Sequence, residues 1–183
     1  QRDNMSFSVK QGLLAVGFAM VASHAIAQES TNQVGANTDW YVYEEAAPSK
    51  TCWAVSKPKE TVNTDSAGRL KSVTRSEILL FVTYGPASGV NGQVSFLGGY
   101  PFAPGSEVSL DIGGSDFTLF TKSEDETAWA VTPEDDAKII AAMKRGSAAT
   151  LTARSARGTI TKDTFSLLGF TASVEEAAKR CGG

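Results

Sequence analysis

Short runs in which apolar and polar residues alternate constrain the fold of this chain more than any other feature. Residues 108–112 and 117–119 alternate around the pair Gly113-Gly114, and residues 149–154 alternate again. A period of two places the apolar side chains on one face of a strand, and a glycine pair between two such runs favours a hairpin. Further apolar runs predict strands at 40–44, 51–57, 78–84, 93–97, 127–131 and 159–168. We therefore expect a mainly β protein, built as an antiparallel β-sandwich or a barrel-like domain.

Two segments predict helices instead. Residues 132–146 begin with Thr132 as N-cap and Pro133 in the first turn, followed by three acids, and end with two basic residues and a glycine. Near the C-terminus, Ser173 and Glu176 fit a capping box. The apolar positions that follow fall on one helical face: Val174, Ala177, Ala178 and Cys181. One mid-chain helix and a short C-terminal helix complete the expected fold.

Several local features are also expected from the pattern. Residues 57–76 are polar and without a period, which predicts a long connection. Residues 78–84 are apolar almost without a break, which is typical of a strand buried on both faces. Ile160 and Phe165 differ in parity, so one face of the last strand holds both only if a bulge lies near Lys162-Asp163. The tryptophans all lie in predicted strands and are expected in the core: Trp40, Trp53 and Trp129.

The first residues have the pattern of a secretory signal peptide. Lys10 precedes an apolar run over 12–22, and Ala25-Ile26-Ala27 supplies the small residues of a cleavage site. The run is shorter than the roughly 20 apolar residues of a membrane span, so a retained anchor is the alternative and no span is expected after cleavage.

The expected location is the periplasm, or the outside of a bacterium as a secreted or surface protein. The expected organisation is upstream residues and signal peptide over 1–27, a flexible leader over 28–38 and a single β-rich domain over 39–183.

The chain has two cysteines, Cys52 and Cys181. Disulfides form and persist in exported proteins, and two cysteines are too few for a metal site built from four. We therefore expect one disulfide between them, which would fasten the C-terminus to an early strand.

Charge and histidine content exclude several classes of function. The chain carries 17 Lys and Arg against 20 Asp and Glu, for a formal net charge of -3. No basic surplus is present to neutralise a phosphate backbone, so nucleic acid is not an expected partner. The single histidine, His24, lies inside the expected signal peptide. The mature protein then lacks the usual general base of nucleophilic triads and the commonest ligand of catalytic zinc.

Three stretches of the sequence carry a resemblance to a known family: residues 157–170, with the ending Ser166-Leu167-Leu168-Gly169-Phe170, the loop 99–102 and the helical segment 139–146. Together they resemble the invasion-associated locus B family of alphaproteobacterial exported proteins. The likeness extends over roughly Trp40 to Cys181. It implies an envelope protein, and it brings no catalytic residues that transfer to this sequence.

Candidate chemical groups are few. The acidic clusters 124–126 and 134–136 match no calcium loop, and a solvated loop and the helix dipole explain them, so no metal or cofactor is expected. Ser166 with Asp163, or with Lys162, can be drawn as a catalytic pair, although such residues in an alternating strand usually form the solvent face.

The loop Tyr100-Pro101-Phe102 is the best candidate for a partner contact. Aromatic residues in a loop rich in glycine and proline at a sheet end are enriched where partners bind, and the alternative is that they plug the core. We expect a non-catalytic envelope protein whose partner is a protein or another envelope component. The alternative from a different class is a histidine-free hydrolase acting on cell-envelope polymers.

Overall fold

A computed structural model describes residues 32–122 and 124–181 of the chain. The expected signal peptide and its cleavage site lie outside these residues. The elements in chain order are β1 (Gln33–Asn37), β2 (Trp40–Glu45), β3 (Thr51–Ser56), β4 (Glu60–Thr64), β5 (Leu79–Gly85), η1 (Pro86–Ser88), β6 (Val90–Leu97), β7 (Glu107–Ile112), β8 (Ser115–Thr121), β9 (Thr127–Ala130), α1 (Pro133–Arg145), β10 (Ala148–Arg154), β11 (Ile160–Ser166) and α2 (Phe170–Cys181). The expected mainly β fold with one mid-chain and one C-terminal helix is therefore confirmed.

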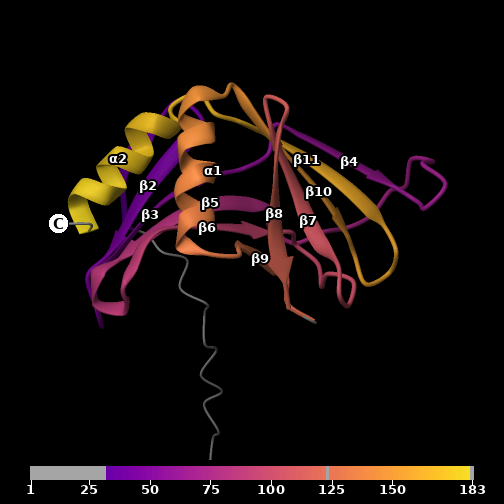
Figure 1. Cartoon of the computed structure of the whole chain (residues 1–183), viewed down its shortest axis with the longest axis horizontal. Helices are drawn as coiled ribbons and strands as arrows, with labels where there is room; N and C mark the ends of the chain where they lie inside the picture. Colours follow the sequence, from indigo (N-terminus) through magenta and orange to yellow (C-terminus); the bar gives the residue numbers. More distant parts are fainter. Residues whose placement is uncertain (1–31, 123, 182–183) are drawn as a thin grey trace, which may run out of the picture.

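All eleven strands belong to one antiparallel sheet, in the order β1-β2-β3-β5-β6-β9-β8-β7-β10-β11-β4. The sheet curves strongly, so that its two halves cross in Figure 1. Its inner face encloses the core: Phe96 of β6 meets Phe165 of β11 with ring centroids 6.2 Å apart, although four strands separate them in the sheet order. The curvature also brings the ends of the sheet together, because the Trp40 indole of β2 donates to the Ser166 carbonyl of β11 at 2.9 Å.

The two helices cover the inner face of the sheet on the β1 to β6 side (Figure 1). The N-cap of α1 forms as expected, since Thr132 Oγ1 accepts from the Asp135 N–H at 3.2 Å. Asp136, in the next position, is buried and accepts from the Val94 N–H at 2.7 Å. This bond satisfies a donor of β6 at the point where the pairing with β9 stops at Ser95. Asp136 therefore joins α1 to β6, in addition to complementing the helix dipole.

The expected disulfide joins Cys52 of β3 to Cys181 of α2, with the Cα atoms 5.7 Å apart. The buried side of α2 carries Val174, Ala177 and Cys181, as the helical spacing predicts. The capping box at Ser173 and Glu176 is wrong. The helix begins at Phe170, and Ser173 lies buried inside it, where its hydroxyl accepts from the Asn37 amide at 3.0 Å.

Two strands lie where the sequence predicts irregular chain. The expected leader 28–38 contains β1, which pairs with β2, and the expected connection 57–76 contains β4, which pairs with β11. Both lie at the edges of the sheet. Their polar residues give no alternating signal, because backbone pairing with a neighbour fixes them rather than burial of one face. At Gly35 of β1, an added Cβ would lie 2.5 Å from the Glu176 carboxylate of α2, so a larger residue there would require this side chain to move.

The expected bulge near Lys162-Asp163 is also wrong. β11 pairs without a register shift with both β10 and β4. The buried face of the strand carries Thr161, Asp163 and Phe165, and Ile160 points to the other face. The parity conflict disappears because a carboxylate, rather than an apolar side chain, occupies the core position at 163.

β5 is buried on one face only. Leu80 and Val82 are fully buried, whereas Leu79 and Phe81 are half-buried on the outer face, the face turned away from the core. The tryptophans divide in the same way. Trp40 is in the core as expected, but Trp53 and Trp129 are half-buried on the outer face. Large apolar side chains therefore lie on both faces of this part of the sheet.

Candidate functional site

The structure places the loop Tyr100-Pro101-Phe102 against the core. Phe102 is 1% exposed, and its ring centroid lies 6.2 Å from that of Phe96 and 5.3 Å from that of Tyr100. Tyr100 is half-buried, and Pro101 is the exposed member of the three. Phe102 is therefore a core side chain, and this corrects its assignment as a partner contact.

We expect Phe102→Leu to lower the free energy of unfolding by about 1 to 2 kcal/mol, because a smaller branched side chain leaves part of a packed ring site empty. Equilibrium unfolding in urea measures the change. The matched control is Pro101→Ala in the same loop, whose exposed side chain removes little packing. A Phe102→Leu variant as stable as the parent would contradict the core assignment.

A buried ion pair lies beneath this loop. Arg75 Nη2 is 2.7 Å from Asp163 Oδ2 and Arg75 Nη1 is 2.8 Å from Asp163 Oδ1, and the two side chains are 5% and 0% exposed. The guanidinium also donates to the Gly98 carbonyl through Nε and Nη2, at 3.0 and 2.7 Å. The same group lies 4.8 Å from the centroid of the Tyr100 ring. The Arg75 guanidinium thus ties together segments that are far apart in the sequence: the 71–78 connection, the 98–102 loop and β11.

Tyr100 completes this cluster. Its hydroxyl and that of Thr161 are hydrogen-bonded at 2.5 Å. Burial raises the pKa of Tyr100 to about 12, so the phenol remains protonated over the physiological range. A neutral phenol, a paired guanidinium and a paired carboxylate form a rigid polar support rather than a reactive centre.

The catalytic pairs drawn from the sequence do not come together. Asp163 points into the core, whereas Ser166, three positions along the strand, points to the other face. Lys162 and Ser166 are four positions apart in an extended strand, so their Cα atoms are roughly 13 Å apart. Within the described residues, no group of three or more His, Cys, Asp or Glu is arranged to hold a metal ion.

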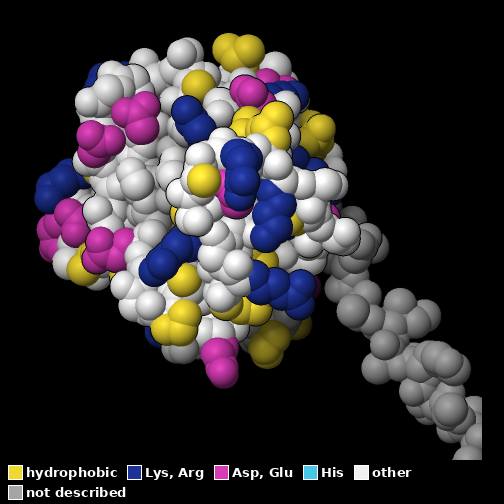
Figure 2. Space-filling view, turned by 90° about the vertical axis from the view of Figure 1, so that its right-hand side faces the viewer, with side chains coloured by type: hydrophobic (Ala, Val, Ile, Leu, Met, Phe, Trp, Pro, Cys, Tyr) yellow, Lys and Arg dark blue, Asp and Glu magenta, His cyan; other side chains and the backbone are white. Residues whose placement is uncertain are grey.

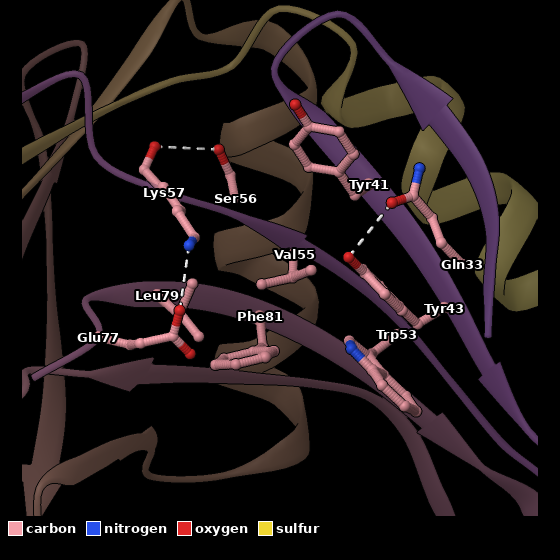
Figure 3. A pocket seen from close by; sticks show the side chains of 10 residues that line it. All are labelled: Gln33, Tyr41, Tyr43, Trp53, Val55, Ser56, Lys57, Glu77, Leu79 and Phe81. Atoms are coloured by element: carbon pink, nitrogen blue, oxygen red, sulfur yellow. Dashed lines mark hydrogen bonds and ion pairs between the residues drawn. The ribbon is translucent and has the colours of Figure 1, made fainter. Parts of the chain in front are cut away.

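An aromatic groove lies on the outer face of β2, β3 and β5 instead (Figure 3). Its cavity volume is about 590 Å³. Tyr43 and Trp53 stack with ring centroids 5.7 Å apart and an interplanar angle of 7°, and Tyr41 is 41% exposed beside them. Phe81 forms the side toward β5. We call these four residues, with the groove they line, the aromatic groove.

Polar groups border the aromatic groove. Tyr43 donates from its hydroxyl to the Gln33 side-chain oxygen at 3.3 Å, and Lys57 pairs with Glu77 at 3.0 Å (Figure 3). Apolar and aromatic walls with a few polar groups at the rim are typical of surfaces that bind other molecules.

The strand register extends the apolar surface beyond the groove. Tyr41 lies opposite Val55, and Val55 lies opposite Phe81. The same row continues through Ser95 to Trp129 and then to Phe120. With about 4.8 Å between neighbouring strands, this outer row is roughly 24 Å long. The rings of Phe120 and Trp129 are 5.6 Å apart, and Lys122 Nζ lies 5.1 Å from the centroid of the Trp129 ring.

Sequence reasoning missed this surface because it has no separate signal. In β3 and β5, apolar side chains occupy successive positions, so the two faces cannot be told apart from composition. The one available signal was the alternation Trp40, Val42 against Tyr41, Tyr43, in which tyrosines occupy the outward positions.

A sequence model of one protein family, described as Invasion associated locus B (IalB) protein, matches residues 40–178. This range contains the four residues of the aromatic groove, the buried ion pair, all of α1 and α2 as far as Ala178. Gln33, at the border of the groove, lies outside it. No curated protein and no solved structure matches the chain.

Proposed function

Since the chain belongs to the invasion-associated locus B family, we propose that it is a non-catalytic protein-binding module of the bacterial cell envelope. The aromatic groove and the outer row carry this proposal. Tyrosine, tryptophan and phenylalanine at a surface supply large contact areas with few rotatable bonds, and they are enriched where proteins bind one another. Contiguous apolar patches on a protein surface mark interaction sites.

The disulfide and the family support export, and we place the protein in the periplasm or on the outer surface. No helix in the described parts of the chain is long and apolar enough to cross a membrane. The partner is a protein of the same compartment, which reaches the outer face of the sheet without meeting either helix, because both helices cover the inner face.

Photocrosslinking tests the location of the partner contact. Benzoylphenylalanine at Tyr41 replaces one exposed aromatic ring by another, and Leu168, which is 61% exposed, offers a matched control position. We expect a crosslinked product from position 41 and none from position 168. In a variant that also carries Trp53→Ala, the product should fall about tenfold or more, since a binding aromatic contributes about 2 kcal/mol.

Equal crosslinking from both positions, or crosslinking that survives Trp53→Ala in a folded variant, would contradict the proposed contact surface. The non-catalytic part of the proposal has its own test. Purified envelope polymers incubated with the protein should release no soluble fragments, and fragment release would make the protein a hydrolase.

A further inference from the structure

A second, polar pocket lies at the opposite end of the sheet from the disulfide. It is enclosed by the 71–76 segment, the 99–101 loop and the turn 155–159, and its cavity volume is about 610 Å³. This pocket is separate from the aromatic groove, and no residue lines both. We call it the hydroxyl pocket, because seven of its lining residues carry a hydroxyl group: Ser72, Thr74, Ser76, Tyr100, Ser155, Thr159 and Thr161.

The walls of the hydroxyl pocket are fixed by bonds within the protein. Arg75 is held by Asp163 and by the Gly98 carbonyl, so the 71–76 segment cannot shift without breaking a buried ion pair. The turn is closed by the Thr159 N–H, which donates to Ser155 Oγ at 3.0 Å. Ser72, Thr74 and Ser76 are exposed, and their hydroxyls can both donate to and accept from a ligand. Ser155, Thr159 and Thr161 are buried and belong to the supporting wall. The pocket is therefore preorganised for a ligand that is rich in hydroxyl groups.

The rim of the pocket is positively charged. Lys71 Nζ lies 3.3 Å from Thr159 Oγ1, which places the ammonium beside the turn that carries Arg157. No ion pair within 32–122 or 124–181 involves either cation, and the two acids nearest Lys71 in the sequence pair with other cations: Asp65 with Arg69 at 2.7 Å and Glu77 with Lys57 at 3.0 Å. Figure 2 shows the side of the molecule that carries β4, which is the right-hand side of Figure 1. Several Lys and Arg side chains lie close together near the centre of this view.

The acidic groups at this site are fewer. Glu126 lines the pocket and accepts from the Ser76 hydroxyl at 3.2 Å. Asp163 is fully neutralised by Arg75. Two rim cations thus stand against one carboxylate, which favours a ligand with a single negative charge.

We propose that the hydroxyl pocket binds an acidic sugar. The sugar carboxylate would lie between Lys71 and Arg157, where charge-assisted hydrogen bonds form, and the ring hydroxyls would exchange hydrogen bonds with the serine and threonine side chains. A hexuronic acid combines both groups in one unit. The source is either a free uronic acid or a uronic acid residue within an envelope polysaccharide, and the two share this chemistry.

Saturation-transfer NMR with the purified protein tests the assignment, with glucuronate as the free acid, a glucuronate tetramer as the polymer fragment, and glucose, acetate and inorganic phosphate as controls. We expect a Kd for glucuronate in the millimolar range and weaker binding of all three controls. Tighter binding of the tetramer than of the monomer would identify a polysaccharide as the source, and equal binding would identify the free acid.

The double variant Lys71→Gln, Arg157→Gln should weaken glucuronate binding about tenfold or more, because both charge-assisted contacts are lost. Lys162→Gln, an exposed cation on the outer side of β11, is the matched control and should leave binding unchanged. All three substituted side chains are at the surface, so thermal unfolding should confirm that each variant folds.

The proposal would be overturned if acetate or phosphate bound as tightly as glucuronate, or if the two variants lost binding equally. The absence of glucuronate binding would overturn it as well. None of these results depends on the partner of the aromatic groove, so the two proposals fail separately.

Discussion

Replacing Asp163 by Ala should lower the free energy of unfolding by about 3 to 5 kcal/mol. The substitution leaves the Arg75 guanidinium, whose side chain is 5% exposed, without its counter-charge in the interior. The Gly98 carbonyl still accepts from it, but a carbonyl does not neutralise a full charge. Urea unfolding followed by circular dichroism measures the loss.

Two further variants separate the charge effect from simple loss of packing. In the double variant Arg75→Met, Asp163→Leu no charge is left unpaired, so much of the lost stability should return. The exposed pair Lys144–Glu175 is the matched control. Its Glu175 side chain is 61% exposed, and Glu175→Ala should cost less than about 1 kcal/mol. A loss at Asp163→Ala as small as that at Glu175→Ala would show that water or a rearranged loop compensates the charge.

The Arg75–Asp163 ion pair also explains why the sequence predicts a bulge in β11 that the structure does not have. Alternation predicts β7, β8 and β10, and helical spacing with terminus signals predicts both helices, because each of these elements buries one apolar face. In β11 the core position 163 holds a carboxylate whose partner lies 88 residues earlier in the chain. A rule that assigns apolar residues to the core and polar residues to solvent then requires a bulge that does not exist. Only the long-range partner makes Asp163 a core residue.

The sequence predicts neither the edge strands β1 and β4 nor the half-buried outer faces of β3 and β5, for different reasons. β1 and β4 bury too little surface to produce a pattern, and their position is set by pairing with β2 and β11. β3 and β5 carry apolar side chains on both faces, so a fully buried strand and a strand with an exposed binding face have the same composition. The sequence therefore points to the 100–102 loop, where aromatic residues stand among glycines, and gives no indication of the half-buried rings on the outer face of the sheet.

Removal of the disulfide should have the largest effect on stability. The bond between Cys52 and Cys181 closes a loop with a sequence separation of 129 residues. On the chain-entropy model a cross-link of this span lowers the entropy of the unfolded chain enough to stabilise the fold by about 4 to 5 kcal/mol. Both sulfur atoms lie in the core, at 0% and 3% exposure. We therefore expect the double variant Cys52→Ser, Cys181→Ser to lose about this amount in urea unfolding.

The loss should not be uniform over the molecule, because α2 has other attachments. Trp40 and Phe170 meet edge to face with centroids 4.8 Å apart, and the Ser173 hydroxyl accepts from the Asn37 amide at 3.0 Å. The Phe170 end of the helix therefore stays packed, whereas the last turn, which carried the bond, opens first. Amide hydrogen exchange should show lost protection near residue 180 and retained protection near residue 174. Uniform loss along α2 would mean that the cross-link, rather than apolar packing, holds the whole helix on the sheet. A stability change below about 1 kcal/mol would mean that the cross-link constrains neither state.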